Sequence, residues 1–336
     1  TGTGQFSFSD RGSLVYVVGT GSVALDSGLA LVDRDGVIER LNVPPANYRS
    51  PRVSPDGTQL VVHSVDADNT DIWVYDLSGN TTIRQMSFDG LNAWPEWTPD
   101  GEWITFASTR DTEQLARVAS IYRTRADGTG VAERLTTAED RHFHMPESYS
   151  GDGRLSFRDE EVRGVFGVWT LSSEDGDEPE VFVGLPESNQ LGSVFSPDGN
   201  WIAYTSNESG TYEIYVQPFP PTGAKSQITH TGGISPLWSP DGSQLFFRPN
   251  GQQLIAVDIE TTPAVTFGIP QPIPISTLAV GRHFDIMPDG KRFGVVVPVA
   301  DEVTEEEETE DEQAPPGQIN VVLNWFEELK ERVPIP

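Results

Sequence analysis

The sequence predicts an all-β protein, a β-propeller of seven four-stranded blades, from a repeated turn, the spacing of its copies and the strand-like runs around them. The clearest copy of the turn is Trp238-Ser239-Pro240-Asp241-Gly242, with the apolar run 245–247 after it. Pro presets φ at the second turn position, Asp can accept hydrogen bonds from nearby backbone, and Gly adopts a positive φ. This stretch therefore predicts a β-hairpin.

The turn recurs along the whole chain. Successive copies start 43 to 52 residues apart, close to the length of a four-stranded propeller blade. The copies start at Ser9 (a decayed one), Ser54, Thr98, Ser150, Ser196, Ser239 and Met287. Seven copies predict seven blades. Six blades are the alternative, if the first and last copies combine into one blade.

Each repeat has the same order of elements. A strand-like run follows each turn, at 14–18, 60–62, 103–106, 155–157, 201–204, 245–247 and 293–297. A second apolar run follows, at 29–32, 72–75, 121–122, 168–171, 214–216, 254–257 and 319–323. Shorter polar runs at 38–41, 83–86, 132–135, 181–183 and 227–229 are typical of outer edge strands. The aromatic residues Trp73, Tyr122, Trp169 and Tyr215 recur at one point of the second run and predict packing between blades.

The last repeat is irregular. Residues 301–312 carry nine carboxylates, and Pro315-Pro316-Gly317 follows them, so 301–317 is predicted to be an acidic, disordered loop. Residues 325–333 (WFEELKERV) predict a short amphipathic helix. We expect this helix, or a strand upstream of Thr1, to close the ring. Residues 1–336 are assigned to one propeller domain.

Composition excludes several classes of function. With 22 Lys and Arg against 51 Asp and Glu, the net charge is −29, which repels nucleic acids and anionic membrane surfaces. We therefore expect neither nucleic-acid binding nor direct membrane contact, and we expect a monomer. The absence of Cys rules out disulfides and thiolate sites. No G-x-S-x-G elbow or phosphate-binding loop is present, so no catalytic residue is assigned.

The repeats resemble the TolB-like family of β-propellers built from Pro-Asp repeats. The resemblance rests on Ser-Pro-Asp-Gly, on the run 71–77 (DIWVYDL), and on Arg84-Gln85-Met86-Ser87 and Arg134-Leu135-Thr136-Thr137. A narrower resemblance is to the propeller region that follows bacterial serine/threonine protein kinases, carried by 48–57, 206–210, 215–220 and the ending 319–329 (INVVLNWFEEL). It implies a bacterial, extracytoplasmic (periplasmic or cell-surface) sensor or scaffold. No kinase motif is present.

The first strand of each propeller blade lines the axis, and the residues just before it form one mouth of the channel. The candidate ligand-binding residues at this mouth are Arg49, Trp94, His144, Gln190, Arg282 and His283. Together they predict a locally basic, aromatic-lined pocket for a protein or small-molecule ligand. The alternative is that these residues only fill the channel. The preferred function is non-catalytic recognition at the propeller axis.

We expect no cofactor, and the alternative is a bound zinc or calcium ion. His142 and His144 lie on one side of a strand, because strand side chains alternate with period two. With Glu147, His283 or Asp285 across the axis, they would suffice for zinc with an open position. The run 66–71 superficially resembles a calcium loop, but we expect a polar hairpin tip there. The alternative function is a hydrolase or lactonase that acts at the axial mouth, with or without a metal ion. The fold does not choose between binding and catalysis, because function resides in sites and not in the fold.

Overall fold

The computed structural model describes residues 27–66, 69–78, 83–111, 118–161, 164–172, 178–249, 253–262, 264–275 and 283–299, and the backbone of strands at 6–8, 14–17 and 319–322. The chain divides into two compact units, one spanning Asp26–Val299 and one combining Thr1–Leu25 with Ala300–Pro336. The first unit is the propeller. The assignment of residues 1–336 to one domain stays a prediction.

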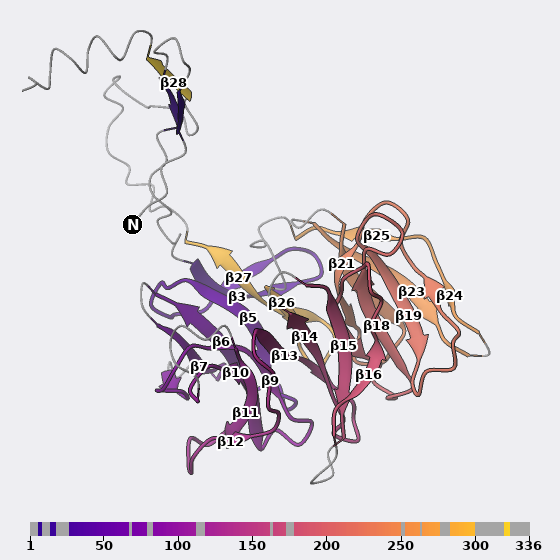
Figure 1. The fold of residues 1–336 in the computed structure, drawn as a ribbon, viewed down its shortest axis with the longest axis horizontal. Coiled ribbons are helices and arrows are strands. Elements are labelled where there is room, and N and C mark those ends of the chain that lie inside the picture. Colours follow the sequence, from indigo (N-terminus) through magenta and orange to yellow (C-terminus); the bar gives the residue numbers. More distant parts are fainter. Residues whose placement is uncertain are drawn as a thin grey trace, which may run out of the picture. The chain divides into compact units, whose positions relative to one another are not determined.

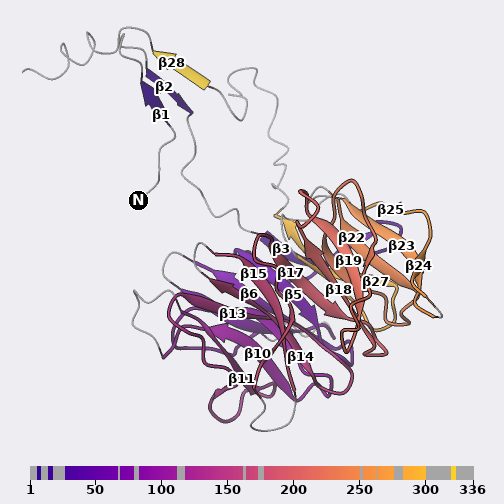
Figure 2. The same cartoon turned by 45° about the vertical axis from the view of Figure 1, so that its right-hand side comes forward.

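The propeller has six blades, each an antiparallel sheet (Figures 1 and 2). From inner to outer strand, the first three blades are β5 (Tyr48–Val53), β6 (Gln59–Val65), β7 (Thr70–Asp76) and β8 (Ile83–Gln85); β9 (Asn92–Trp97), β10 (Trp103–Ser108), β11 (Ser120–Arg125) and β12 (Glu133–Arg134); and β13 (His142–Tyr149), β14 (Leu155–Glu161), β15 (Phe166–Leu171) and β16 (Glu180–Val183). The fourth and fifth are β17 (Gln190–Phe195), β18 (Trp201–Ser206), β19 (Glu213–Pro218) and β20 (Ser226–Gln227); and β21 (Ile234–Trp238), β22 (Gln244–Arg248) and β23 (Leu254–Glu260), which pairs with both β24 (Thr266–Phe267) and β25 (Gln271–Ile273).

The sixth blade closes the ring with strands from both ends of the propeller. Its inner strands are β26 (Phe284–Ile286) and β27 (Arg292–Pro298), and its outer strands are β3 (Ser27–Asp33) and β4 (Ile38–Arg40). Figure 1 shows β27, coloured for the end of the chain, beside β3, coloured for its start. The predicted count of seven blades is therefore wrong. The first and last repeats each supply half of one blade, and six, the alternative count, is correct.

Two predicted strands belong to the other unit. There β1 (Phe6–Phe8) pairs with β2 (Leu14–Val17), and β2 pairs with β28 (Ile319–Val322). The strand predictions near 14–18 and 319–323 were correct, but these strands pair with each other and not within the propeller. Ring closure through β3 and β27 also corrects the closure expected from a C-terminal helix or an upstream strand.

The predicted C-terminal helix at 325–333 and the acidic loop at 301–317 lie outside the described residues. The part of the chain that the structure describes contains strands and turns but no helix. Within it, nothing has the length and apolarity of a membrane-spanning helix.

The apolar core lies between the blades. Buried side chains of the described residues form six clusters, and each cluster joins two neighbouring blades. Tyr122 of the second blade, for example, packs in one cluster with Ile72 and Val74 of the first. The predicted role of the recurring aromatic residues is confirmed, since Trp73, Trp169 and Tyr215 also join clusters shared with the preceding blade. Burial of this kind is the main stabilising term for such a fold.

The repeated turn is stabilised by its own side chains. Ser239 Oγ donates to Asp241 Oδ1 at 2.6 Å and accepts from the Gln244 amide at 2.9 Å. These bonds to Ser239 and to the Ser243 backbone lower the pKa of Asp241 to about 2. Gly242 has a φ of 73°, as the turn requires. The turns lie at the opposite end of the inner strands from the residues predicted to bind a ligand.

Candidate functional site

A cavity of about 520 Å³, here called the axial pocket, lies where the inner strands of all six blades meet. Its volume is within the range of small-molecule sites. Each blade contributes at least one lining residue, including Arg49 and Arg52 on β5, Trp94 on β9, Glu147 on β13, Gly192 on β17, Ser235 on β21 and His283 just before β26. The site thus exists only once the ring has closed.

Irregularities in the inner strands shape the axial pocket. Ser50, Trp94, Gly192 and Ser235 all line it, and all have a positive φ, between 48° and 66°. Each lies where the pairing between an inner strand and its second strand shifts register. Such β-bulges re-aim side chains, and non-glycine residues in this conformation are strained and cluster at ligand sites. The bulges therefore mark the pocket as a functional candidate.

Basic side chains outnumber acidic ones in the axial pocket, although the chain as a whole is strongly acidic. Arg49, Arg52, Arg158, His63 and His283 line it, whereas Glu147 is the one carboxylate among the described lining residues. Arg49 is exposed, and its Nε donates a long hydrogen bond of 3.4 Å to Asn47 Oδ1. No described carboxylate forms an ion pair with Arg49. Its charge therefore remains available to a ligand.

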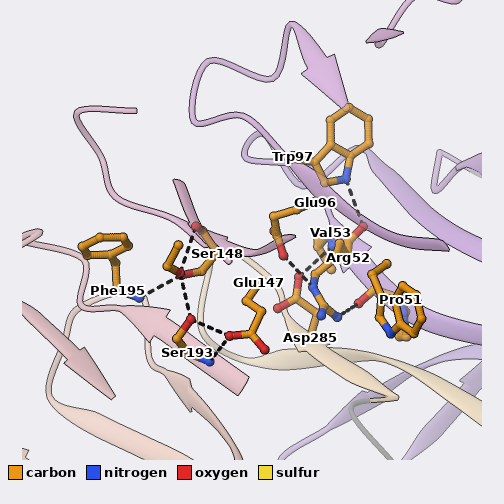
Figure 3. A network of polar contacts seen from close by, with 12 residues as sticks. Pro51, Arg52, Val53, Glu96, Trp97, Glu147, Ser148, Ser193, Phe195 and Asp285 are labelled. Carbon is orange, nitrogen blue, oxygen red and sulfur yellow. Dashed lines mark hydrogen bonds and ion pairs between the residues drawn. The ribbon is translucent and has the colours of Figure 1, made fainter. Parts of the chain in front are cut away.

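Arg52 is held by a buried ion pair between the first two blades. Its Nε donates to Glu96 Oε2 at 2.8 Å, with side chains only 5% and 14% exposed (Figure 3). Arg52 Nη1 also donates to the Pro51 carbonyl at 2.7 Å, and Trp97 Nε1 donates to the Arg52 carbonyl at 3.1 Å. Loss of one partner from such a pair would leave a buried charge uncompensated. Arg52 therefore shapes the pocket wall more than it offers a free charge.

Glu147 joins the third and fourth blades. One carboxylate oxygen accepts from the Gly192 amide at 2.7 Å, and the other accepts from the Ser193 amide at 2.7 Å and the Ser193 hydroxyl at 2.6 Å (Figure 3). On the far side of the ring, Asp285 Oδ2 accepts from the Val53 amide at 2.8 Å. Both carboxylates accept from inner-strand amides of the next blade, which makes them positioning groups for the pocket.

His63 is buried in the wall between the first two blades. It is 3% exposed, and its Nδ1 accepts from the Trp94 amide at 3.4 Å. Burial, reinforced by the charges of His283, Arg49 and Arg52, lowers the pKa of His63 from 6.5 to about 3. The ring is therefore neutral near pH 7. With Nδ1 accepting, its proton lies on Nε2.

The structure separates the predicted ligand-binding residues into three groups. Arg49, Trp94 and His283 line the axial pocket together. His144 does not, because its Nδ1 hydrogen-bonds Thr136 Oγ1 at 2.9 Å and its ring packs against Phe157.

Gln190 is fully buried, accepting from the Leu185 amide at 3.0 Å and donating to Ser188 Oγ at 2.9 Å. Gln190 therefore stabilises the loop before its strand, and it does not line the axial pocket. Arg282 lies outside the described residues.

The metal candidates do not form one cluster. His142 Nδ1 lies 2.8 Å from Asp159 Oδ1, and His144 Nε2 lies 3.7 Å from the same oxygen. Glu147 and His283 line the axial pocket instead. Among the described residues, no group of three or more His, Cys, Asp or Glu side chains is arranged to hold a metal ion.

Sequence reasoning missed Arg52, His63 and Arg158, all of which line the pocket. His63 and Arg158 lie on the second strands β6 and β14, whereas the prediction considered only residues near the start of the inner strands. One signal was available. Pro directly follows Ser50, Trp94 and Ser235, and Pro inside a strand indicates a bulge.

Comparisons with known proteins agree with this architecture. Residues 34–176 match the family model PD40, the TolB beta propeller domain. A protein from Agrobacterium tumefaciens assigned as a TolB superposes with a TM-score of 0.62 at 18% identity, covering 81% of this chain and 98% of that one. TolB from Acinetobacter baumannii superposes with a TM-score of 0.54 at 18% identity, covering 83% and 80%. The chain thus shares the β-propeller fold of these TolB structures.

Sequence relatives cover smaller regions. An uncharacterised protein of Agrobacterium fabrum is 28% identical over 211 residues, 58% of this chain and 67% of that protein. The Tol-Pal system protein TolB of Alcanivorax borkumensis is 31% identical over 103 residues, 29% of this chain and 23% of that protein. Oligogalacturonate lyase from Vibrio parahaemolyticus shares the fold with a TM-score of 0.51 at 11% identity, covering 86% of this chain and 76% of that one.

Proposed function

We propose that this chain is a non-catalytic recognition domain that binds an anionic segment of a protein partner, or an anionic small ligand, in the axial pocket. The observation that carries the proposal is the gathering of three arginines, against one carboxylate, in the lining of one cavity of a molecule with a net charge of −29. Cavities whose lining is mainly of one sign of charge focus the field and attract ligands of the opposite sign. An anionic ligand is therefore favoured in the axial pocket, against the charge of the whole molecule.

We further propose an extracytoplasmic location and a protein partner. The location is supported by the resemblance of the chain's ending to propellers that follow bacterial kinases. A relative named as a Tol-Pal system protein supports a role within a protein assembly. A sensor or scaffold is the role that combines both, and it requires no direct membrane contact by the propeller.

Binding of this kind requires no metal, so we propose no resident cofactor. Elemental analysis of chelator-free protein, followed by a screen with ester and lactone substrates, tests this against the hydrolase alternative. We expect no turnover. Stoichiometric zinc or calcium, together with turnover that EDTA abolishes, would favour the enzyme.

The direct test of the binding proposal is a calorimetric titration with hexaglutamate at low salt. We expect binding that weakens about tenfold in Arg49→Gln, because a charge-assisted hydrogen bond is lost. Arg134→Gln is the matched control, since Arg134 is an exposed residue of the outer strand β12, and it should bind as the wild type does. Failure of hexaglutamate to bind, or equal binding by both variants, would contradict the proposal.

A further inference from the structure

We infer that the axial pocket works together with an adjoining apolar pocket, and that the two recognise the C-terminal residue of a peptide whose last side chain is apolar. The inference rests on the proposed function and specifies its ligand. The carboxylate would lie against Arg49 and the side chain in the apolar pocket. No residue of the chain reacts with the peptide.

The adjoining cavity, here called the side pocket, has a volume of about 210 Å³. It lies among the first three blades, and its walls are mainly apolar. They include Val65, Leu91, Ala93, Ala107, Ala119 and Phe143. Three of these are alanines, so the space exists because small side chains stand where larger ones would fill it.

The two pockets share a wall. Arg49, His63 and Trp94 line both the axial pocket and the side pocket. The positive φ of Trp94 places this residue at the bulge in β9, and its ring lies 6.0 Å from that of His63. A ligand held by Arg49 is therefore beside the opening of an apolar cavity.

The size of the side pocket fits one side chain. An apolar cavity of about 150 Å³ in another protein binds benzene, so about 210 Å³ accepts a phenyl or isobutyl group. Burial of such a group should strengthen binding about 10- to 100-fold relative to a ligand ending in glycine.

The charges of the wall shared by the two pockets indicate which polar group of the ligand lies beside its apolar side chain. Arg49 is exposed and forms no ion pair with a described residue, so it can pair with a carboxylate. Arg52 is already paired with Glu96, and His63 is neutral near pH 7, with Nε2–H as a donor. The shared wall thus offers one free positive charge and one neutral donor.

The ligand must present its carboxylate and its apolar side chain close together, because Arg49 lines both pockets. In a peptide these two groups share a Cα atom only at the C-terminal residue. An internal acidic residue lies at least one residue, about 3.8 Å between Cα atoms, from the nearest apolar side chain. A peptide C-terminus therefore fits the paired pockets better than an internal acidic segment does.

The test is a calorimetric comparison of acetyl-Gly-Gly-Ser-Phe with its C-terminal amide and with the same peptide ending in Gly. We expect the Phe acid to bind about 10- to 100-fold more tightly than the Gly acid, and the amide to lose at least about tenfold. Leu91→Ala, which removes part of the apolar wall at a half-exposed residue, should weaken the preference for Phe over Gly, and Ala107→Leu, which fills the side pocket, should abolish it. Arg134→Gln should leave it unchanged.

Equal affinity for the Phe and Gly peptides, or for the acid and the amide, would overturn the inference. If hexaglutamate still binds in an Arg49-dependent manner, the proposed function survives that result. If neither hexaglutamate nor the peptides bind, both fail. N-acetylphenylalanine that binds as tightly as the peptide would overturn the assignment to a peptide in favour of a small carboxylate.

Discussion

His63 illustrates how the fold changes the chemistry of a single side chain. An exposed histidine would be partly charged near neutral pH. Here burial and three neighbouring cationic or imidazole groups lower its pKa to about 3. The folded protein therefore keeps a neutral imidazole in the wall of a pocket lined by arginines. His63 contributes a hydrogen-bond donor to this wall but no positive charge near pH 7.

This depressed pKa predicts a pH-dependent stability. Between pH 6.5 and about 3, the unfolded chain binds a proton at position 63 that the folded chain does not, so stability falls as the pH falls. His63→Asn retains an acceptor for the Trp94 amide but does not titrate. Between pH 6.5 and 4.5 we expect the wild type to lose about 2 kcal/mol more stability than the variant.

Urea unfolding at the two pH values measures this difference. The lower limit of pH 4.5 keeps the turn aspartates ionised, because hydrogen bonds lower the pKa of Asp56 and Asp241 below the usual value. Parallel loss of stability in both proteins would show that His63 titrates normally.

At the scale of the element, the repeated turn both ends a strand and touches the next blade. A Cβ atom added to Gly57 would lie 3.3 Å from Cδ of Pro288, which belongs to the turn of the preceding blade. A Cβ atom added to Gly290 would likewise lie 3.6 Å from Cδ of Pro240, and one added to Gly242 would lie 3.7 Å from Cδ of Pro197. The Pro and Gly of the motif therefore fit together between blades, which local turn chemistry alone does not require.

Two glycine substitutions separate these roles. Gly57 and Gly128 have similar φ values, 73° and 81°, but an added Cβ at Gly128 would meet nothing within 4 Å. Both alanine variants should lose about 1 kcal/mol from the left-handed backbone. We expect Gly57→Ala to lose about 1 kcal/mol more through crowding against Pro288. Equal losses in chemical denaturation would show that the contact between turns adds nothing.

At the scale of the whole molecule, the pairing of β27 with β3 holds the ring closed. Seven residue pairs are in register, from Arg292 with Asp33 to Pro298 with Ser27. This pairing joins the two ends of the propeller unit, and the axial pocket takes lining residues from all six blades. Closure and binding are thus linked.

A cysteine pair tests this closure. Gly28→Cys with Val297→Cys joins residues that lie opposite each other, and the natural chain has no Cys to compete. Opposed residues in antiparallel strands lie within the Cα range for a disulfide. We expect a disulfide that raises stability by about 2–4 kcal/mol over the reduced form. Failure to form it under oxidising conditions would contradict the pairing.

The sequence alone determined the order of strands and turns within one blade. The turn at Ser196-Pro197-Asp198-Gly199 and the strands around it were predictable, because a hairpin depends on residues close together in the chain. The sequence also placed Arg49 and His283 at the channel mouth, and both line the axial pocket, since the inner strand of each blade lines the axis.

Only the tertiary structure decided the number of blades, because β3 and β27 are partners from opposite ends of the propeller and no local pattern specifies such a partner. It also decided which side chains reach the axial pocket. Strand residues alternate between faces, so His144 turns away while Met145 lines the pocket. His63 enters from a second strand, through pairing opposite Arg49, and this contact depends on register that the sequence pattern leaves open.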